Sequence, residues 1–180
     1  MNLLDKNFKE IFSGQVISNL GGLIAGLGIA IYTDKILLIP GMFVLLPGFL
    51  ELRGNISGTL SSRLSSGFFV GAIKSDSMNS IIVKANVIAS FLLVMIVSYF
   101  LGLLAYFFNF FVNHVSTPRI IWIPLIAGII ANLVEIPLTL FLTFYLYKKG
   151  HDPNNIMGPF ITSSGDITSV AAILIALWVI

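Results

Sequence analysis

One carboxylate, Asp166, stands among small and hydroxyl residues in the stretch GPFITSSGDITSV, residues 158–170, shortly before an apolar C-terminus. Helical spacing puts Thr162, Asp166 and Ser169 on one face. A carboxylate inside a membrane helix is costly, so Asp166 must be neutral, paired with another helix or paired with a bound cation. Carboxylate and hydroxyl oxygens favour hard cations such as Mg²⁺ or Ca²⁺ over Zn²⁺ or Cu⁺. We therefore expect a cation site at Asp166.

A second acid, Glu135, lies deep in the apolar segment IIWIPLIAGIIANLVEIPLTLFLTFYLYKK. Asn132, Thr139 and Thr143 share its face, because they follow helical steps of three and four residues. An acid at this depth should face the interior of a helix bundle. Two roles stay open for Glu135: lining an ion pathway, or holding helices together through hydrogen bonds.

Glu51, Arg53 and Asn55 lie in PGFLELRGNISGTLSSRLS, residues 47–65, where an apolar run gives way to small and hydroxyl residues. Prolines and glycines in and before this stretch predict a kinked or broken helix, namely Pro40, Gly41, Pro47, Gly48, Gly54 and Gly58. Carbonyls freed by such a break are cation ligands. Alternatively, Glu51 and Arg53 only mark the membrane surface, whereas Asn55 lies deeper.

The elements that carry these residues must cross a membrane. The 180 residues are 57% hydrophobic and 10% charged, with a mean hydropathy of +0.98, whereas a soluble domain is about 25% charged. A net charge of +2 is too small to indicate a nucleic-acid partner. The sequence has no Cys, and its two His residues, His114 and His151, are predicted in loops on opposite sides. We predict a multi-pass protein of the cell membrane without a cofactor.

Five long apolar runs predict an all-α integral membrane protein with five transmembrane helices. They cover about residues 11–32, 36 to an uncertain end, 81–112, 120–147 and 156–180. Basic residues favour one side, which predicts a cytoplasmic N-terminus and an external C-terminus: Lys6, Lys9, Arg63, Lys74, Lys148 and Lys149 against Lys35 and Arg119. The start MNLLDKNFKE is interpreted as a short amphipathic lead rather than a cleaved signal peptide. Residues 1–180 are expected to form a single transmembrane domain without a separate soluble domain.

The first apolar run carries small residues at every fourth position, namely Gly14, Ser18, Gly22, Gly26 and Ala30. Small residues at this spacing let two helix backbones approach closely. We interpret the stripe as a packing face, either within the chain or between two copies.

Two motifs resemble the MgtE family of magnesium transporters, and especially its eukaryotic solute-carrier relatives. PGFLELRGNISGTLSSRLS is similar to that family's pattern of Pro, then Gly-Asn, then Ser-Arg-Leu. DPNNIMGPFITSSGDITSV, residues 152–170, resembles its last-helix pattern of Asp-Pro, Gly-Pro, Thr-Ser or Thr-Thr, then Asp. The motifs occur in the family's order, and the five-helix count matches its membrane domain.

The resemblance implies a pathway between two five-helix units, with Asp166 as the central ligand of a hydrated Mg²⁺ and with Asn55 and Thr162 beside the pathway. The partner is then a second copy of the chain or a homologous five-helix unit. Bacterial members have Gly-Gly-Asn where this chain has Arg-Gly-Asn, so Arg53 would repel the ion unless Glu51 neutralises it. Bacterial members also carry cytosolic sensor domains, and with about ten residues before its first helix this chain is expected not to gate in that way.

The leading hypothesis is therefore divalent cation transport, most specifically of Mg²⁺, without enzymatic activity. A coupled cation exchanger is an alternative and would need a second ion site, for which Glu135 is the candidate. An accessory or assembly subunit, whose polar residues only bind helices together, is another. A membrane enzyme is disfavoured, because the intramembrane acids are single and lie on separate helices.

Overall fold

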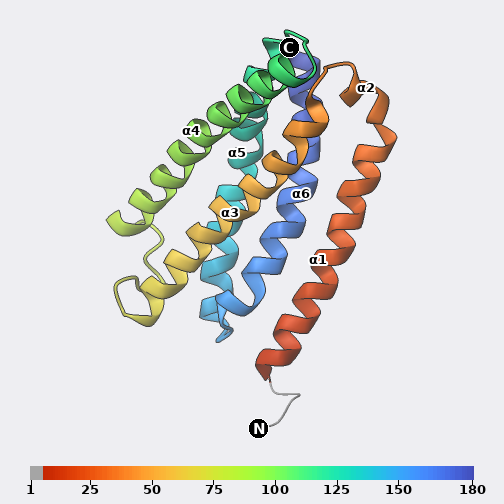
Figure 1. The fold of residues 1–180 in the computed structure, drawn as a ribbon. Coiled ribbons are helices and arrows are strands. Elements are labelled where there is room, and N and C mark those ends of the chain that lie inside the picture. Colours follow the sequence, from red (N-terminus) through yellow and green to blue (C-terminus); the bar gives the residue numbers. More distant parts are fainter. Residues whose placement is uncertain (1–5) are drawn as a thin grey trace.

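The computed structural model describes residues 6–180; residues 1–5, which belong to the predicted amphipathic lead, and the side chain of Lys6 lie outside the described part of the chain. The described residues form a bundle of helices (Figure 1). The helices are α1 (Lys6–Ile31), α2 (Thr33–Leu37), α3 (Met42–Phe69), α4 (Ile81–Val112), α5 (Arg119–Lys148) and α6 (Pro153–Val179). The predicted all-α architecture is confirmed for this part of the chain, and the third predicted segment coincides with α4.

Helix α6 occupies the middle of the bundle. It packs against α1 on one side and against α3 and α5 on the other, and α4 packs against α3 and α5. In Figure 1, α1 and α4 form the two outer edges, and the start of α1 and the end of α6 lie at opposite ends of the bundle. The helix that carries Asp166 therefore contacts three of the four other long helices.

Four of the helices among residues 6–180 are long and apolar enough to cross a membrane, namely α1, α4, α5 and α6. Helix α3 is not among them, although it has 28 residues. It carries Glu51, Arg53 and Arg63 together with many Ser residues, which lower its hydropathy. The helix that the sequence predicts as the second span is thus the most polar of the long helices.

The predicted break in the second segment falls at Pro40 and Gly41, between α2 and α3. Gly41 has a φ of 89°, which favours glycine, and a Cβ there would lie 2.9 Å from Cδ1 of Ile120. Asn109 fixes this turn by donating a hydrogen bond of 3.2 Å to the carbonyl of Pro40. Beyond the turn, α3 is helical from Met42 to Phe69, through Gly54 and Gly58, so the break does not fall beside Asn55.

Two apolar clusters fill the bundle, one toward each end. The first is built around Met42, Phe49, Ile123 and Ala131, where α3 and α5 begin. The second is built around Leu60, Leu64, Phe68, Ile136 and Phe144, where both helices approach their ends. Between these two clusters, α3 and α5 bury the polar residues Arg53, Asn132 and Glu135, next to a smaller apolar group of Leu52, Ile56 and Val94.

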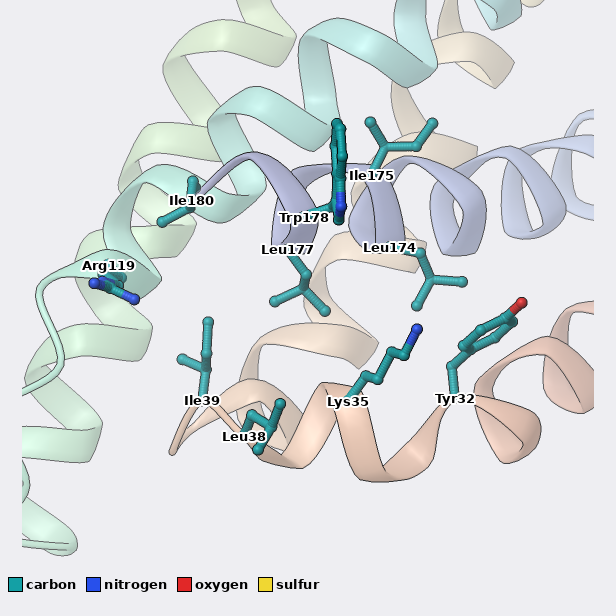
Figure 2. Close-up of a pocket in the computed structure, with 10 residues that line it drawn as sticks. All are labelled: Tyr32, Lys35, Leu38, Ile39, Arg119, Leu174, Ile175, Leu177, Trp178 and Ile180. Atoms are coloured by element: carbon teal, nitrogen blue, oxygen red, sulfur yellow. The ribbon is translucent and has the colours of Figure 1, made fainter.

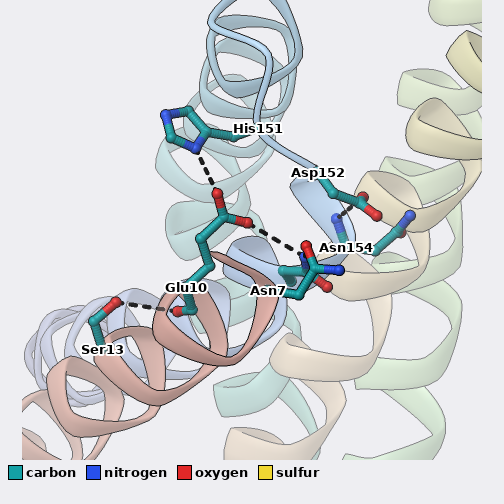
Figure 3. Close-up of polar contacts among 7 residues, drawn as sticks. Asn7, Glu10, Ser13, His151, Asp152 and Asn154 are labelled. Atoms are coloured by element: carbon teal, nitrogen blue, oxygen red, sulfur yellow. Dashed lines mark hydrogen bonds and ion pairs between the residues drawn. The ribbon is translucent and has the colours of Figure 1, made fainter. Parts of the chain in front are cut away.

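Helix α1 is attached to the rest of the chain along α6 and at the start of α6. Figure 3 shows Glu10 of α1 beside His151 of the preceding loop, with Glu10 Oε1 2.7 Å from His151 Nδ1. Asn155 of α6 donates a hydrogen bond of 3.3 Å to the other carboxylate oxygen of Glu10. These contacts fix the N-terminal end of α1 against the α5–α6 loop.

The small residues of α1 that meet α6 repeat at alternating steps of four and three. A Cβ on Gly14 would lie 3.5 Å from Cγ of Pro159, and one on Gly21 would collide with Ser163, whereas Gly22 and Gly26 have nothing within 4 Å. A strict step of four advances about 40° each time on a helix of 3.6 residues per turn, so the predicted stripe turns away from α6. The face toward α6 contains Gly14, Ser18, Gly21, Ala25 and Gly28.

Candidate functional site

Close packing of α3 against α6 brings the two sequence motifs together. A Cβ on Gly54 would lie 4.0 Å from Oγ1 of Thr162, and a Cβ on Gly165 would lie 3.9 Å from Cβ of Arg53. Glycine at these two positions leaves only van der Waals separation between the helices. The segment around Asn55 therefore lies beside the segment around Asp166.

Four oxygen-bearing residues of α3 and α6 form what we call the outer polar face. Glu51 and Asn55 of α3 and Thr162 of α6 are exposed, and Asp166 is half-buried. The carboxylates of Glu51 and Asp166 are close enough to repel each other. Steps of four residues align the members on each helix. The outer polar face thus presents two like charges and two neutral oxygen donors at the bundle surface.

The two acids of the outer polar face have no partner of opposite charge. Among residues 6–180, neither Glu51 nor Asp166 takes part in an ion pair or a side-chain hydrogen bond. Thr162 uses its hydroxyl within its own helix and donates a 3.1 Å hydrogen bond to the carbonyl of Gly158. The carboxylate oxygens are therefore free to bind a ligand that approaches from outside the protomer.

A second group of polar residues lies inside the protomer, and we call it the inner polar cluster. Its charged members are Arg53 of α3 and Glu135 of α5, each with a side chain that is 1% exposed. The two charges attract each other. Arg53 also donates from Nη1 to the carbonyl of Gly128 at 3.5 Å. Burial excludes this pair from the solvent and from the surface that holds Asp166.

Helix α6 supplies the hydrogen bonds to Glu135. Thr168 donates from Oγ1 to Oε1 of Glu135 at 3.0 Å, and Ser164 donates from Oγ to Oε2 at 3.4 Å. Asn132 lies one turn before Glu135 and is also 1% exposed, and its amide nitrogen and oxygen are buried without a hydrogen-bond partner. The inner polar cluster therefore links α3, α5 and α6 through one buried acid.

The predicted site residues divide between these two regions. Asp166, Asn55, Thr162 and Glu51 lie on the outer polar face, whereas Asn132 and Glu135 belong to the inner polar cluster. Ser169 shares a helical face with Thr162 by spacing but is fully buried, because other helices cover α6 at its level. Thr139 and Thr143 are likewise buried, on the face of α5 that the spacing predicted.

Arg53 lies on the opposite side of α3 from the one that the sequence suggested. It points toward α5, where Nη1 donates to the carbonyl of Gly128, and the opposite charge that acts on it is Glu135 and not Glu51, although the two side chains form no direct ion pair. A separation of two residues rotates a side chain by about 200° around a helix, which separates Arg53 from Asn55. The positive charge that was expected to repel a cation is therefore buried and compensated.

Ser164 and Thr168 are the polar residues that sequence reasoning missed. They follow each other at a step of four on α6, offset by two residues from Thr162 and Asp166. Two interleaved polar stripes on one helix predict two polar faces. The same signal exists on α3, where Arg53, Ser57, Ser61 and Ser65 form a buried stripe beside the exposed one.

These features define a class of protein: a helical membrane protein with unpaired carboxylates on a polar face of its apolar bundle, as cation-transporting proteins have. Comparison with known families gives the particular family. Residues 46–176, well over half of the chain, match the MgtE family, described as divalent cation transporter. The chain therefore belongs to the MgtE family of divalent cation transporters. No curated protein and no solved structure matched the chain.

Proposed function

We propose that this chain moves Mg²⁺ across the cell membrane through a pathway between two five-helix units, with Asp166 as the central ligand of a partly hydrated ion. Asn55, Thr162 and Glu51 line the pathway beside it. The whole of residues 1–180 acts as one transmembrane domain. In it, α3 crosses the membrane as well as α1, α4, α5 and α6, which gives five spans. The observation that carries the proposal is the unpaired Asp166 carboxylate beside Glu51 on an exposed face of the bundle.

The cost of charge in lipid argues for a partner unit. Two acids at membrane depth on a face toward hydrocarbon would cost several kcal/mol. A second unit that covers α3 and α6 would enclose the outer polar face and give it water and ions instead of lipid. The second unit is another copy of the chain or a homologous five-helix unit. A symmetric pair would bring two copies of Asp166 to one axis.

The donor set suits a hydrated magnesium ion. Mg²⁺ gives up its water reluctantly and is commonly held by one or two carboxylates through a retained hydration shell. Asp166 supplies the charge, and the amide oxygen of Asn55 and the hydroxyl oxygen of Thr162 can accept hydrogen bonds from the ion's water. Mn²⁺, Ca²⁺ and Co²⁺ share this preference for oxygen donors in part and are the competitors to test.

The inner polar cluster is proposed to keep Arg53 away from the ion. Glu135 offsets the positive charge of the guanidinium inside the protomer. A cation at the outer polar face is therefore attracted by the two acids there, Glu51 and Asp166. Glu135 then acts as a counter-ion and not as a second ion site. An inside-negative potential favours entry of a dication by about 4.6 kcal/mol per 100 mV. The basic loops predict that the N-terminus lies on the cytoplasmic side.

The proposal is tested by Mg²⁺ uptake into proteoliposomes under an inside-negative potential. Asp166→Asn keeps the size of the side chain and removes its charge, and Asp76→Asn, in the exposed α3–α4 loop, is the matched control. We expect uptake by the unmodified chain and by the control, and loss of uptake in Asp166→Asn at equal reconstitution and equal oligomer size.

Three results would contradict the proposal. Uptake that survives Asp166→Asn would remove Asp166 from the pathway. A folded, reconstituted chain that moves no divalent cation would favour an assembly subunit, whose polar residues only hold helices together. Uptake that requires an opposing gradient of a second ion would replace passive flow by coupled exchange.

A further inference from the structure

A pocket of about 630 Å³ opens at the bundle end where α1 ends and α5 begins, away from both polar regions. It lies between α2 and the last turns of α6, with the first residue of α5 at its edge (Figure 2). Most of its lining is apolar and includes Leu174, Leu177 and Ile39. Such a lining can hold a hydrocarbon chain.

Two cations border this apolar pocket, and no acidic side chain lines it. Lys35 of α2 points into the space between α2 and α6, and Arg119 lies at the opposite edge (Figure 2). Both side chains are exposed, and Nζ of Lys35 lies 5.4 Å from the centre of the Tyr32 ring. A ligand that satisfies this pocket needs an apolar body and a negatively charged head.

The aromatic residues of the pocket mark the depth at which such a ligand would lie. Trp178 is 88% exposed and Tyr32 is 40% exposed. Trp and Tyr gather at the boundary between hydrocarbon and headgroups, and basic side chains reach toward the headgroups there. The pocket is therefore open to one leaflet at the level of the lipid phosphates.

We propose that this pocket binds an anionic phospholipid, with one acyl chain between α2 and α6 and with the phosphate held by Lys35 and Arg119. Arg and Lys are the common partners of phosphate oxygens, and Arg can bind two of them at once. A neutral headgroup such as phosphatidylcholine carries its own cation and gains less from the two basic side chains. The site is separate from the proposed ion pathway, so it does not depend on transport.

Quenching of Trp178 by brominated lipids tests the proposal. The chain has two Trp residues, so Trp122→Phe leaves Trp178 as the reporter. The protein is reconstituted in phosphatidylcholine vesicles in which either phosphatidylglycerol or the same fraction of phosphatidylcholine has brominated acyl chains. We expect stronger quenching by the anionic lipid, with a relative affinity of roughly fivefold for each cation that contacts the phosphate.

Charge-removing variants show which side chains cause the preference for the anionic lipid. Lys35→Gln and Arg119→Gln, singly and together, should reduce this preference stepwise to that of a neutral site. Lys84→Gln, on an exposed position of α4, is the matched control and should leave it unchanged. All three positions are exposed, and folding is monitored by elution volume and helical signal in each variant.

Four results would overturn the proposal. Equal quenching by both lipids would mean that the pocket takes any acyl chain. A preference that survives the double variant would place the anion elsewhere. If soluble glycerol phosphate displaces lipid from the pocket while brominated phosphatidylglycerol does not quench Trp178, the pocket binds free anions. If neither lipid quenches Trp178, a second copy of the chain covers it.

Discussion

The outer polar face and the inner polar cluster use neighbouring residues of the same two helices in opposite ways. Asn55 of α3 is exposed, while Arg53, two residues before it, is 1% exposed. On α6, Asp166 is half-buried without a counter-charge, while Thr168 donates a hydrogen bond to the buried Glu135. Opposite charges meet inside the protomer, and like charges meet on its surface.

This difference separates charges that hold the fold from charges that await a ligand. A buried charge must be paired and hydrogen-bonded, because an isolated one is prohibitively costly in a low-dielectric interior. Glu135 accepts hydrogen bonds from Ser164 and Thr168 and is attracted by the positive charge of Arg53. Asp166 does not satisfy this condition within the protomer, so a cation and its water are the partners that would complete it.

The largest expected effect on stability comes from breaking the inner pair. Glu135→Gln leaves Arg53 buried without a counter-ion, and loss of one partner of a buried pair typically costs about 3–5 kcal/mol. We expect a marked fall in the unfolding midpoint in detergent, followed by circular dichroism. Asp166→Asn removes a charge of the same sign from the outer polar face. It should change the free energy of unfolding by less than about 1 kcal/mol, because no pair is broken.

Restoring charge balance should restore stability. Replacing both partners, Arg53→Met with Glu135→Leu, removes the buried charges together, and such apolar replacements are often neutral or stabilising. The double variant should therefore unfold near the unmodified chain and well above Glu135→Gln. A double variant as unstable as the single one would show that the two charges do not compensate each other.

Accessibility gives the next contrast. The chain contains no Cys, so single Cys residues can be introduced without removing others. Asn55→Cys should react with a hydrophilic thiol reagent at least about ten times faster than Ser57→Cys, because only exposed thiols ionise and react readily. Ser57 is 1% exposed on the buried stripe of α3. Equal rates would mean that water reaches both regions alike.

The smallest effect is expected from one substitution made on both faces of α6. Thr168→Val removes a hydrogen bond to Glu135 and should cost about 0.6 kcal/mol, the average for such bonds between membrane helices. Thr162→Val removes only a bond within α6, so it should leave the unfolding midpoint unchanged and alter Mg²⁺ uptake instead. The reverse pattern would exchange the roles of the two faces.

Much of the fold follows from the sequence, because apolar length and turn residues specify each helix locally. The expected segment 81–112 coincides with α4, and 120–147 differs from α5 by one residue at each end. A break in the second segment was also predicted, but its place was not: it falls at Pro40 and Gly41, where Gly41 has a positive φ, whereas Pro47, Gly48, Gly54 and Gly58 lie within α3. The α6-facing side of α1 was harder, because a stripe of small residues does not reveal which of them meet another helix.

The site was predictable only up to the pairing of its faces. Periodicity shows that Asn132, Glu135, Thr139 and Thr143 share one side of α5, and all four are buried. It does not show that Arg53 faces them, because this depends on how α3 is rotated in the bundle. Sequence proximity suggested Glu51 as its partner, whereas helix packing gives Glu135.

The central claim is that the ion uses the outer polar face while the inner polar cluster only supports it. The most direct test is Mg²⁺ uptake by the Arg53→Met, Glu135→Leu double variant, compared with Asp166→Asn in the same proteoliposomes. The account predicts uptake in the double variant and none in Asp166→Asn. A folded double variant without uptake would contradict it and put Glu135 on the ion's path.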